Sequence, residues 1–250
     1  NYLGSRTDGG FAEYVAVPEW NLIELPDSVS FEQAAMLEPM AVAVHAIRQS
    51  GALENVSKDA SVVVAGLGTI GLLVVMFLKE AGCKNIMGVG NKDFQKKCFV
   101  ELGFQEEQFC NVKNQSAADF ILNRTDKAGC QVFFECVGNN ETLNLGLQAL
   151  APGGFLQLVG NPAGDMNLSQ NDYWKILRRQ ITVTGTWNSS FTHDENDDWN
   201  YVIKKLETGA IHPEKLITHR FPLEQIEDGF KIMRDKTEHY IKVMGIFGVS

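Results

Sequence analysis

The 250-residue sequence is poor in cysteine, and its cysteines form no C-x-x-C pair. Neither a zinc knuckle nor a redox dithiol is therefore signalled. We expect reduced thiols and a cytoplasmic protein. The five cysteines are Cys83, Cys98, Cys110, Cys130 and Cys136.

The sequence also lacks an excess of positive charge. Its 22 Lys and Arg residues stand against 31 Asp and Glu residues, which gives a formal net charge of -9. This balance disfavours nucleic acid or an anionic membrane as a non-specific partner. An anionic small ligand would require a local basic pocket.

A secretory leader and a clear membrane span are absent as well. No basic region followed by an apolar stretch and a small-residue cleavage site opens the chain, so we do not expect secretion. The start, NYLGSRTDGGFAEYV, has no Met and alternates like a strand at once, so we expect it to lie within a domain. The run at 62–78 nearly reaches membrane-spanning length. Its three glycines and its change from β-branched to helical periodicity predict a buried strand, a tight turn and a helix instead.

Strand-like and helix-like segments alternate in the middle of the chain. Most of the predicted strands are continuous apolar runs, which suit burial on both faces of a sheet. They lie at 62–65, 85–89, 109–112, 132–135, 155–159 and 181–185. Helical patterns lie at 70–81, 94–102, 117–123 and 141–150. The sequence therefore predicts an α/β fold with a doubly wound parallel sheet.

A glycine motif, GLGTIG at 66–71, lies between the first predicted strand and its helix. It fits the G-x-G-x-x-G pattern in the context that dinucleotide binding requires. Gly66 allows the tight turn, Gly68 lets the backbone approach a pyrophosphate, and Gly71 lets helix and strand pack closely. Thr69 and Ile70 open the helix, whose N-terminus faces the phosphates. The alternative is a tight strand-to-helix turn that binds nothing.

Three other strand ends carry glycines that permit close backbone approach. They read ECVG from 135, LVGNP from 158 and GTWN from 185. Ligands of open α/β sheets bind outside the carboxyl ends of the strands. Each stretch alone is equally typical of an ordinary turn, but together they favour a cofactor. The candidate contacts are Cys136, Val137, Val159, Gly160, Asn161, Thr186 and Trp187.

The end of the second predicted strand bears on the type of cofactor. Dehydrogenases that prefer NAD place an Asp or Glu there, which accepts hydrogen bonds from the ribose and repels a 2′-phosphate. Gly90 occupies that position, followed by Asn91 and Lys92. Lys92 would supply positive charge to a 2′-phosphate, so we expect NADP, with NAD possible. In the competing interpretation, Asp93 takes the acid's role and Lys92 is a solvated residue.

Several stretches together resemble the zinc-containing medium-chain dehydrogenases. They are GSRTDGGFAEYV, LEPMAVAVHAI, GLGTIGLL, ECVG, KILRRQITVTGTW and LITHRFPLEQIEDGF. The sequence is similar to the polyol branch, first to galactitol-phosphate dehydrogenases and next to sorbitol dehydrogenases. The resemblance implies a Rossmann domain at 41–191. It also implies parts of a strand-rich, GroES-like catalytic domain: the C-terminal part of its N-terminal segment at 1–40, and a helical return with the rest of it at 192–250.

The resemblance starts about a hundred residues into the family's sequence, after the motifs that supply two catalytic zinc ligands and the lobe that binds a structural zinc. Glu38 in LEP aligns with the family's third zinc ligand, and a catalytic site uses three protein ligands. From this sequence alone, a helix-entry residue before a proline is the favoured interpretation of Glu38, and the resemblance reverses that preference. His45 is at a position that the family does not use for metal, so we expect a supporting role for it.

The implied reaction is hydride transfer between a secondary alcohol and NAD(P), with zinc polarising the alcohol oxygen. Val42, one helical turn past Glu38, would pack on the nicotinamide. The expected substrate is a polyol or polyol phosphate, for which Arg6 is a candidate cationic contact, although a solvated surface arginine is the simpler interpretation. The alternatives are a dinucleotide-binding module without catalysis and a zinc-free quinone reductase.

The resemblance also implies a homodimer formed through the cofactor domains. An open sheet must protect its edge. We expect the segment Met166–Ser169 to pair with its two-fold mate in an isologous contact. No nucleic acid or membrane partner is expected.

Overall fold

A computed structural model describes residues 3–52 and 57–247. The chain forms two compact units. The larger unit is Ala35–Ile211, and the smaller is built from residues up to Ala34 together with those from His212 onward. Each unit has its own sheet.

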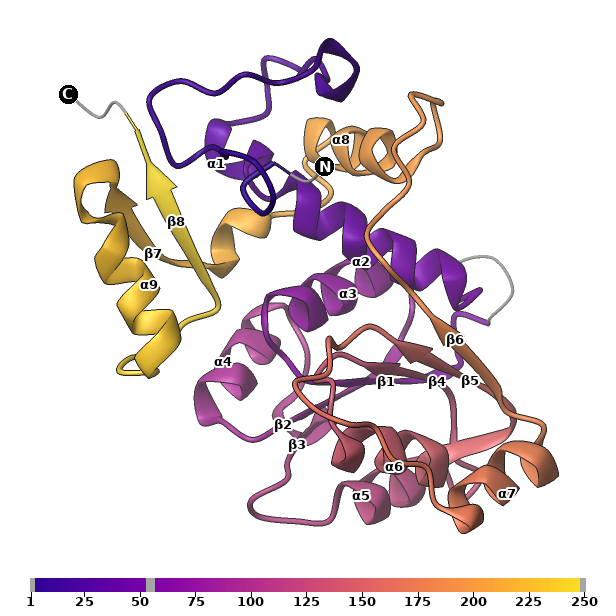
Figure 1. The fold of residues 1–250 in the computed structure, drawn as a ribbon. Helices are drawn as coiled ribbons and strands as arrows, with labels where there is room; N and C mark the ends of the chain where they lie inside the picture. The colour runs from indigo at the N-terminus through magenta and orange to yellow at the C-terminus, as the bar shows by residue number, and fades with distance from the viewer. Residues whose placement is uncertain (1–2, 53–56, 248–250) are drawn as a thin grey trace. The chain divides into compact units, whose positions relative to one another are not determined.

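The larger unit holds a six-stranded sheet in which every pairing is parallel (Figure 1). Its strand order is β3-β2-β1-β4-β5-β6, so the chain reverses direction across the sheet between β1 and β4. This is the predicted doubly wound arrangement. The strands are β1 (Ser61–Ala65), β2 (Asn85–Gly90), β3 (Phe109–Asn111), β4 (Cys130–Glu135), β5 (Leu150–Leu158) and β6 (Thr182–Gly185).

Helices cover both faces of this sheet, as Figure 1 shows for α2 and α3 on one side and α5, α6 and α7 on the other. On the latter side, Val63, Phe133 and Leu156 of the strands pack with Ile121 and Leu147 of the helices in one buried cluster. The helices of the unit are α2 (Leu37–Gln49), α3 (Thr69–Glu80), α4 (Asp93–Glu101), α5 (Ala117–Arg124), α6 (Asn140–Ala149), α7 (Gln170–Arg179) and α8 (Asp198–Glu207), with a 3-10 turn η2 (Glu106–Gln108).

The apolar run at 62–78 forms β1, a turn and α3, as predicted. Every residue of α3 from Gly71 to Leu78 is buried, which explains why the run is so hydrophobic. Among the described residues, no helix is both long and apolar enough to cross a membrane.

The smaller unit contains a two-stranded parallel sheet of β7 (Ile217–Pro222) and β8 (Lys242–Ile246). The helix α9 (Ile226–Asp235) packs on it through Gly229, where a Cβ would crowd Phe221 and Val243. Phe11 contacts Phe230 of this helix edge to face, with ring centroids 5.3 Å apart. Shorter elements are η1 (Glu19–Asn21), α1 (Phe31–Ala34), η3 (Pro213–Leu216) and η4 (Leu223–Gln225).

The strand expected from the alternation at the start of the chain does not form in the described residues. The only strand-type pairing there is an isolated bridge between Leu3 and Thr7. The apolar side chains of this segment are largely exposed, including Phe11, Tyr14 and Trp20. A strand requires a neighbouring strand for its hydrogen bonds, and the described residues of the smaller unit offer none to this segment.

Candidate active site

The carboxyl ends of five strands lie in one row across the sheet. Ala65 of β1 is in register with Val89 of β2 and with Glu135 of β4. Glu135 is in register with Leu158 of β5, which in turn aligns with Gly185 of β6. The residues that follow this row are the predicted cofactor contacts: Gly66, Gly90, Cys136, Val159 and Thr186. The fold therefore brings these sequence-distant positions to one edge.

The turn between β1 and α3 is restricted to glycine at two positions by contact with backbone. Gly66 has a φ of 93°, and a Cβ there would lie 2.5 Å from Cγ2 of Val137 and 3.0 Å from the carbonyl oxygen of Cys136. A Cβ on Gly71 would collide with the carbonyl oxygen of Gly66. These contacts pack the turn between β4 and the start of α3.

Gly68 differs from its two neighbours because the space around it is open. A Cβ there would meet nothing within 4 Å. The residue is exposed and is the N-cap of α3, but it provides no side-chain cap. Thr69 and Ile70 form the first turn of this helix. A helix N-terminus without a side-chain cap, with open space before it, is suited to an anionic phosphate group. The residues therefore fit a dinucleotide pyrophosphate.

A buried carboxylate organises the turns after β4 and β5. Glu135 is 1% exposed. Its Oε1 accepts hydrogen bonds from the backbone N–H groups of Val137 (2.8 Å) and Gly138 (2.9 Å) and from the hydroxyl of Thr142 (2.7 Å). Its carbonyl oxygen accepts from the N–H groups of Val159 and Gly160. Both strand ends are thereby held rigidly together.

The remaining candidate contacts are more exposed. The side chains of Val137 and Trp187 are 41% and 71% exposed, and Asn161 is exposed as well. Thr186 donates its N–H to the carbonyl of Leu158, whereas its hydroxyl oxygen is buried without a partner in the described structure. Apolar and polar surface is thus available beside the glycine turn for a ligand.

Gly90 is the last residue of β2, and Lys92 is the N-cap of α4. Gly90 is not in the left-handed region. A Cβ there would lie 2.7 Å from Oε1 of Gln95 and 3.1 Å from the ring of Phe109. Lys92 is exposed, with its amine 5.4 Å from the ring centroid of Phe94. The turn therefore presents a cation and has no acid at the position of Gly90.

Asp93 is the first residue of α4, and its carboxylate is already engaged. Its Oδ1 accepts a hydrogen bond from the amide of Asn111 at 3.0 Å. Asn91 donates its N–H to Gln95 at 3.3 Å. One oxygen of Asp93 is therefore engaged, while Lys92 and Asp93 are both exposed at this turn.

Glu38 and Val42 lie on α2, with Glu38 in its first turn. Glu38 is exposed, and its carboxylate makes no hydrogen bond or ion pair with the side chain or backbone of another described residue. Val42 is half-buried. Within the described ranges, no group of three His, Cys, Asp or Glu side chains is arranged to hold a metal ion. These residues alone do not make a zinc site, and Glu38 is one available ligand.

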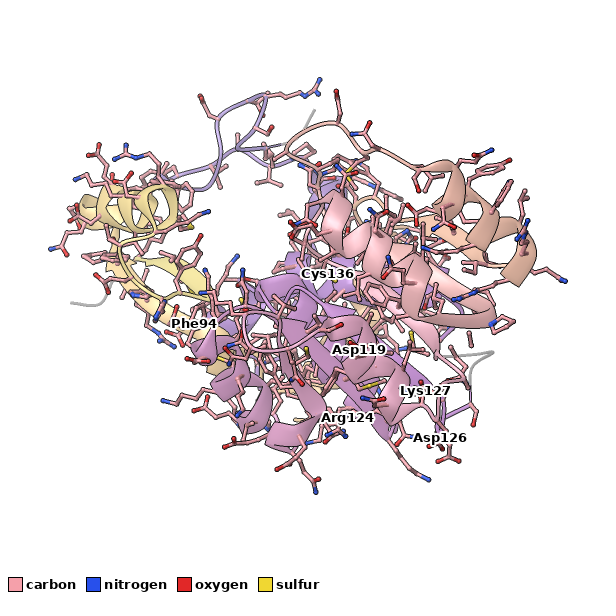
Figure 2. All side chains as sticks on the ribbon, turned by 90° about the horizontal axis from the view of Figure 1, so that it is seen from below. Phe94, Asp119, Arg124, Asp126, Lys127 and Cys136 are labelled. Carbon is pink, nitrogen blue, oxygen red and sulfur yellow. The ribbon has the colours of Figure 1, made fainter. Side chains whose placement is uncertain are left out.

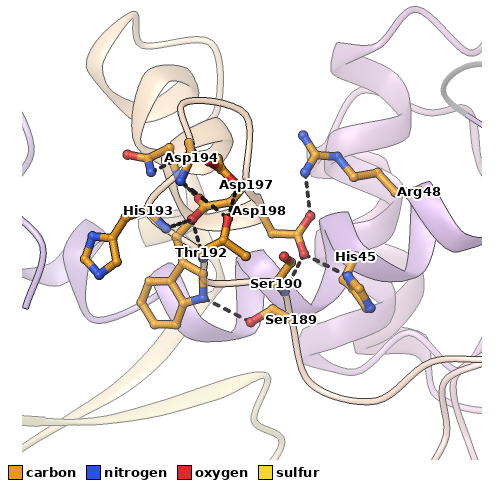
Figure 3. A network of polar contacts seen from close by, with 11 residues as sticks. His45, Arg48, Ser189, Ser190, Thr192, His193, Asp194, Asp197 and Asp198 are labelled. Atoms are coloured by element: carbon orange, nitrogen blue, oxygen red, sulfur yellow. Dashed lines mark hydrogen bonds and ion pairs between the residues drawn. The ribbon is translucent and has the colours of Figure 1, made fainter. Parts of the chain in front are cut away.

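His45 faces a carboxylate of α8 rather than a ligand. Its Nδ1 lies 2.8 Å from Oδ2 of Asp198, and the guanidinium of Arg48 donates to Oδ1 of Asp198 at 2.6 Å (Figure 3). Asp198 is completely buried. The histidine therefore joins α2 to α8.

Cys136 lies beside the glycine turn, but its thiol is not a reactive group. Burial, and then the nearby Glu135 charge, raise the pKa of Cys136 far above its ordinary value. The thiol stays protonated near neutrality and is a poor nucleophile. Burial likewise raises the pKa of Cys110 to about 11 and that of Cys130 to about 12.

Of the non-glycine residues with positive φ in this unit, Asn188 (57°) directly follows Trp187 of the candidate site, whereas two others lie elsewhere. Asp126 and Lys127 both have positive φ, 48° and 67°. Such residues often mark functional strain. Figure 2 shows them away from Cys136, and they precede β4, whereas Cys136 follows it. They are therefore not part of the row of strand ends.

Residues 69–208, more than half of the chain, match the zinc-binding dehydrogenase family. The chain belongs to this family, as the resemblance of its motifs predicted. It is 30% identical to galactitol 1-phosphate 5-dehydrogenase of Escherichia coli (strain K12) over 224 residues, which are 90% of this chain and 63% of that protein. It is 29% identical to L-idonate 5-dehydrogenase of Vitis vinifera over 235 residues, 92% of this chain and 61% of that protein.

Solved structures give the same relationship. Galactitol-1-phosphate dehydrogenase from Escherichia coli superposes with a TM-score of 0.85 at 28% identity, covering 97% of this chain and 68% of that one. For 2R,3R-butanediol dehydrogenase from Bacillus subtilis, the TM-score is 0.82 at 30% identity, with 98% and 66% covered. The chain spans less than two thirds of the length of the curated relatives described above.

Two carboxylates in the site region had no role in the sequence prediction. Glu135 was noted only as part of ECVG, although a carboxylate just before a glycine turn is a signal for capping backbone N–H groups. Asp198 belongs to no motif. The Asp pair before an amphipathic segment signals a helix start, but nothing local indicates the partners of Asp198 on α2.

Proposed function

We propose that the protein containing this chain is an NAD(P)-dependent oxidoreductase that interconverts a secondary alcohol and its ketone. The observation that carries the proposal is the glycine turn at the reversal point of the sheet. Gly66 and Gly71 are fixed by contacts with backbone, whereas Gly68 faces open space at an uncapped helix start. Family membership and the names of the relatives support the same activity.

In this proposal the larger unit binds the cofactor. The N–H groups at the start of α3 bind the pyrophosphate. Asn91 and Lys92 bind the adenosine ribose and its 2′-phosphate, so NADP is preferred and NAD is the alternative. Cys136, Val137 and the turns after β5 and β6 line the nicotinamide half, and Val42 packs on the nicotinamide ring.

Zinc, when bound, would polarise the alcohol oxygen and lower its pKa. Glu38 would provide one ligand, and the others would come from residues outside this chain. Glu38→Ala in the whole protein should reduce zinc content and turnover together. Glu227→Ala, another exposed acid in the first turn of a helix, is the matched control. Unchanged zinc and turnover in Glu38→Ala would remove Glu38 from the site.

The substrate proposed is a polyol or polyol phosphate. The relatives named for galactitol 1-phosphate and L-idonate support this class. Arg6 remains a candidate phosphate contact, and it is exposed in the smaller unit. If it has this role, Arg6→Ala should raise KM for a phosphorylated polyol and leave KM for the free polyol unchanged.

A dinucleotide-binding module without catalysis is the second candidate. The observation favouring it is that the described residues contain no complete metal site. The intact mass of the purified protein discriminates the two. A mass near 27.7 kDa supports the module, whereas a much larger one supports the enzyme. The third candidate function is a zinc-free quinone reductase, which would bind NADPH but retain no zinc.

We also propose a homodimer through the edge of the large sheet. In the single chain, the segment Met166–Ser169 forms no strand and the N–H of Asn167 donates to Asn140, so its pairing with a two-fold mate stays a prediction. The outer edge on that side is β6. Val183 of β6 and Trp174 and Leu177 of α7 are 40–57% exposed, which suits burial by a second copy. A monomeric mass at micromolar concentration would contradict this proposal.

A further inference from the structure

Asp198 is a fully buried carboxylate that connects three parts of the larger unit. It is 0% exposed. Besides His45 and Arg48 of α2, it accepts the backbone N–H of Ser190 at 2.7 Å (Figure 3). A buried carboxylate is retained only when it is paired and hydrogen-bonded. Here both of its oxygens are used.

On α2, the two partners of Asp198 continue the stripe of predicted site residues. Glu38 and Val42 are four residues apart, and Val42 and His45 are three apart. Residues at these spacings lie on the same face of a helix. A rotation or shift of α2 at His45 therefore moves Val42 and Glu38 with it.

On the other side, Asp198 fixes the chain that leaves the sheet after β6. Thr186 and Trp187 follow β6 directly, and Thr186 is still bonded to Leu158. Three residues beyond Trp187, Ser190 is pinned to the start of α8 by two bonds. Its N–H donates to Asp198, and its carbonyl accepts the N–H of Asp198 at 3.2 Å. The segment that carries the candidate nicotinamide contacts Thr186 and Trp187 is thus held at both of its ends, by β5 and by the start of α8.

We propose that Asp198 is a positioning residue for hydride transfer. It sets α2, and so Val42 and Glu38, relative to the segment after β6 that lines the nicotinamide half of the site. The assignment rests on the proposed function. It predicts an effect on the nicotinamide end, whereas the adenosine and pyrophosphate end, held by α3 and α4, is unaffected.

The preceding residue provides a matched control because it is also a buried acid but makes no hydrogen bond to α2. Asp197 is 5% exposed and is the N-cap of α8. It accepts hydrogen bonds from the N–H groups of Thr192, His193 and Asn200. Asn is as good an N-cap as Asp. Asp197→Asn therefore keeps one acceptor oxygen for the cap, loses the hydrogen bonds made by the other carboxylate oxygen, and tests the loop without the link to α2.

The experiment compares Asp198→Asn, Asp197→Asn and His45→Ala in the whole protein. Three quantities are measured: the Kd of ADP-ribose, which has no nicotinamide; kcat for alcohol oxidation, with the deuterium isotope effect; and Tm. We expect Asp198→Asn and His45→Ala to lower kcat about tenfold or more and to raise the isotope effect, with the Kd of ADP-ribose within about twofold of wild type. Asp197→Asn should lower Tm but leave kcat, its isotope effect and the Kd of ADP-ribose unchanged.

A double variant tests whether the two residues act through one contact. Asp198→Asn with His45→Ala should be no slower than the slower single variant. Wild-type kcat in Asp198→Asn, or multiplied losses in the double variant, would overturn the proposal. If Asp198→Asn does not fold, His45→Ala carries the test, because it keeps the buried carboxylate paired with Arg48, and wild-type kcat there is equally contrary. Failure of the wild-type protein to bind ADP-ribose would instead refute the proposed function.

Discussion

The helices of the larger unit begin in two ways. The four helices that come later in the sequence of this unit, α5, α6, α7 and α8, are capped by the side chains of Ser116, Asn139, Ser169 and Asp197, respectively. The three earlier ones, α2, α3 and α4, begin at Met36, Gly68 and Lys92 without a side-chain cap. A capped start satisfies its own backbone N–H groups, whereas an uncapped start leaves them for solvent or a ligand.

This difference separates stability from binding along the same sheet. The first turns of the uncapped helices hold or adjoin predicted site residues: Glu38 on α2, Thr69 and Ile70 on α3, and Lys92 before α4. Changes at capped starts should therefore cost stability alone, with the exception of Asp198 in the first turn of α8, which also contacts His45 and Arg48 of α2. Changes at uncapped starts should alter ligand affinity or the choice of cofactor. Where such a change also disturbs the packing behind the turn, it should reduce stability as well.

The largest effect is expected at the turn before α3. Gly71→Ala places a Cβ against the carbonyl oxygen of Gly66, so strand and helix must separate, at a cost of about 3 kcal/mol or more. Gly68→Ala meets nothing within 4 Å and should change stability by less than about 1 kcal/mol. It should nevertheless weaken NADPH binding about tenfold or more, because the Cβ occupies the pyrophosphate approach.

Urea unfolding and fluorescence titration with NADPH measure these two quantities separately. Wild-type affinity in Gly68→Ala would mean that no pyrophosphate approaches this turn. Unfolding of Gly68→Ala at the urea concentration of Gly71→Ala would show that the distinction between the two glycines is wrong.

The second prediction concerns cofactor choice at the start of α4. Gly90→Asp restores a ribose acceptor and repels a 2′-phosphate, so the ratio of kcat/KM for NADPH to that for NADH should fall about tenfold or more. The new side chain needs the space that Gln95 Oε1 occupies, 2.7 Å from the Cβ position. The double variant Gly90→Asp with Gln95→Ala should therefore be more stable than Gly90→Asp alone. An unmoved ratio in both variants would place the ribose elsewhere.

Lys92→Ala should also lower the ratio of kcat/KM for NADPH to that for NADH, but by less than Gly90→Asp. One lysine about 4 Å from a phosphate charge gains up to roughly 4 kcal/mol at an effective dielectric of about 20. Desolvation and the contact of Lys92 with the Phe94 ring reduce the net effect, so we expect about 1.4 kcal/mol, or about tenfold in NADPH affinity. Lys97→Ala, on the same helix and paired with Glu101, removes the same charge and should leave the ratio unchanged. Equal effects of the two substitutions would indicate that Lys92 acts only through the overall electrostatic potential of the protein and not through contact with the 2′-phosphate.

The fold and the glycine turn were predictable from the sequence because their causes are local. Six apolar runs became the six strands, and G-x-G-x-x-G needs only neighbouring backbone to define its turn. The helix α7 was not predicted although it is amphipathic: Ile176 packs against the core, whereas Tyr173, Trp174 and Leu177 are largely exposed. Asp198 was not found because its partner His45 lies 153 residues away. The pairing of Met166–Ser169 with a two-fold mate stays a prediction, and it would require the N–H of Asn167 to leave Asn140 if that N–H takes part.

The smallest effect is expected at the capped start of α7 and should be seen only in stability. The hydrogen bond from Lys175, followed by that from Ser169, lowers the pKa of Asp172 below its usual value of 3.8. The ionised form is thus favoured in the folded state, so its contribution is present above the unfolded pKa and is lost as the pH falls below about 3.8. Asp172→Asn should cost about 0.5–1 kcal/mol at pH 7, and its difference from wild type in urea midpoint should persist down to about pH 4 and shrink as the pH is lowered below 3.8. NADPH affinity should stay at the wild-type value throughout, and any loss of affinity would mean that capped and uncapped starts do not divide stability from binding.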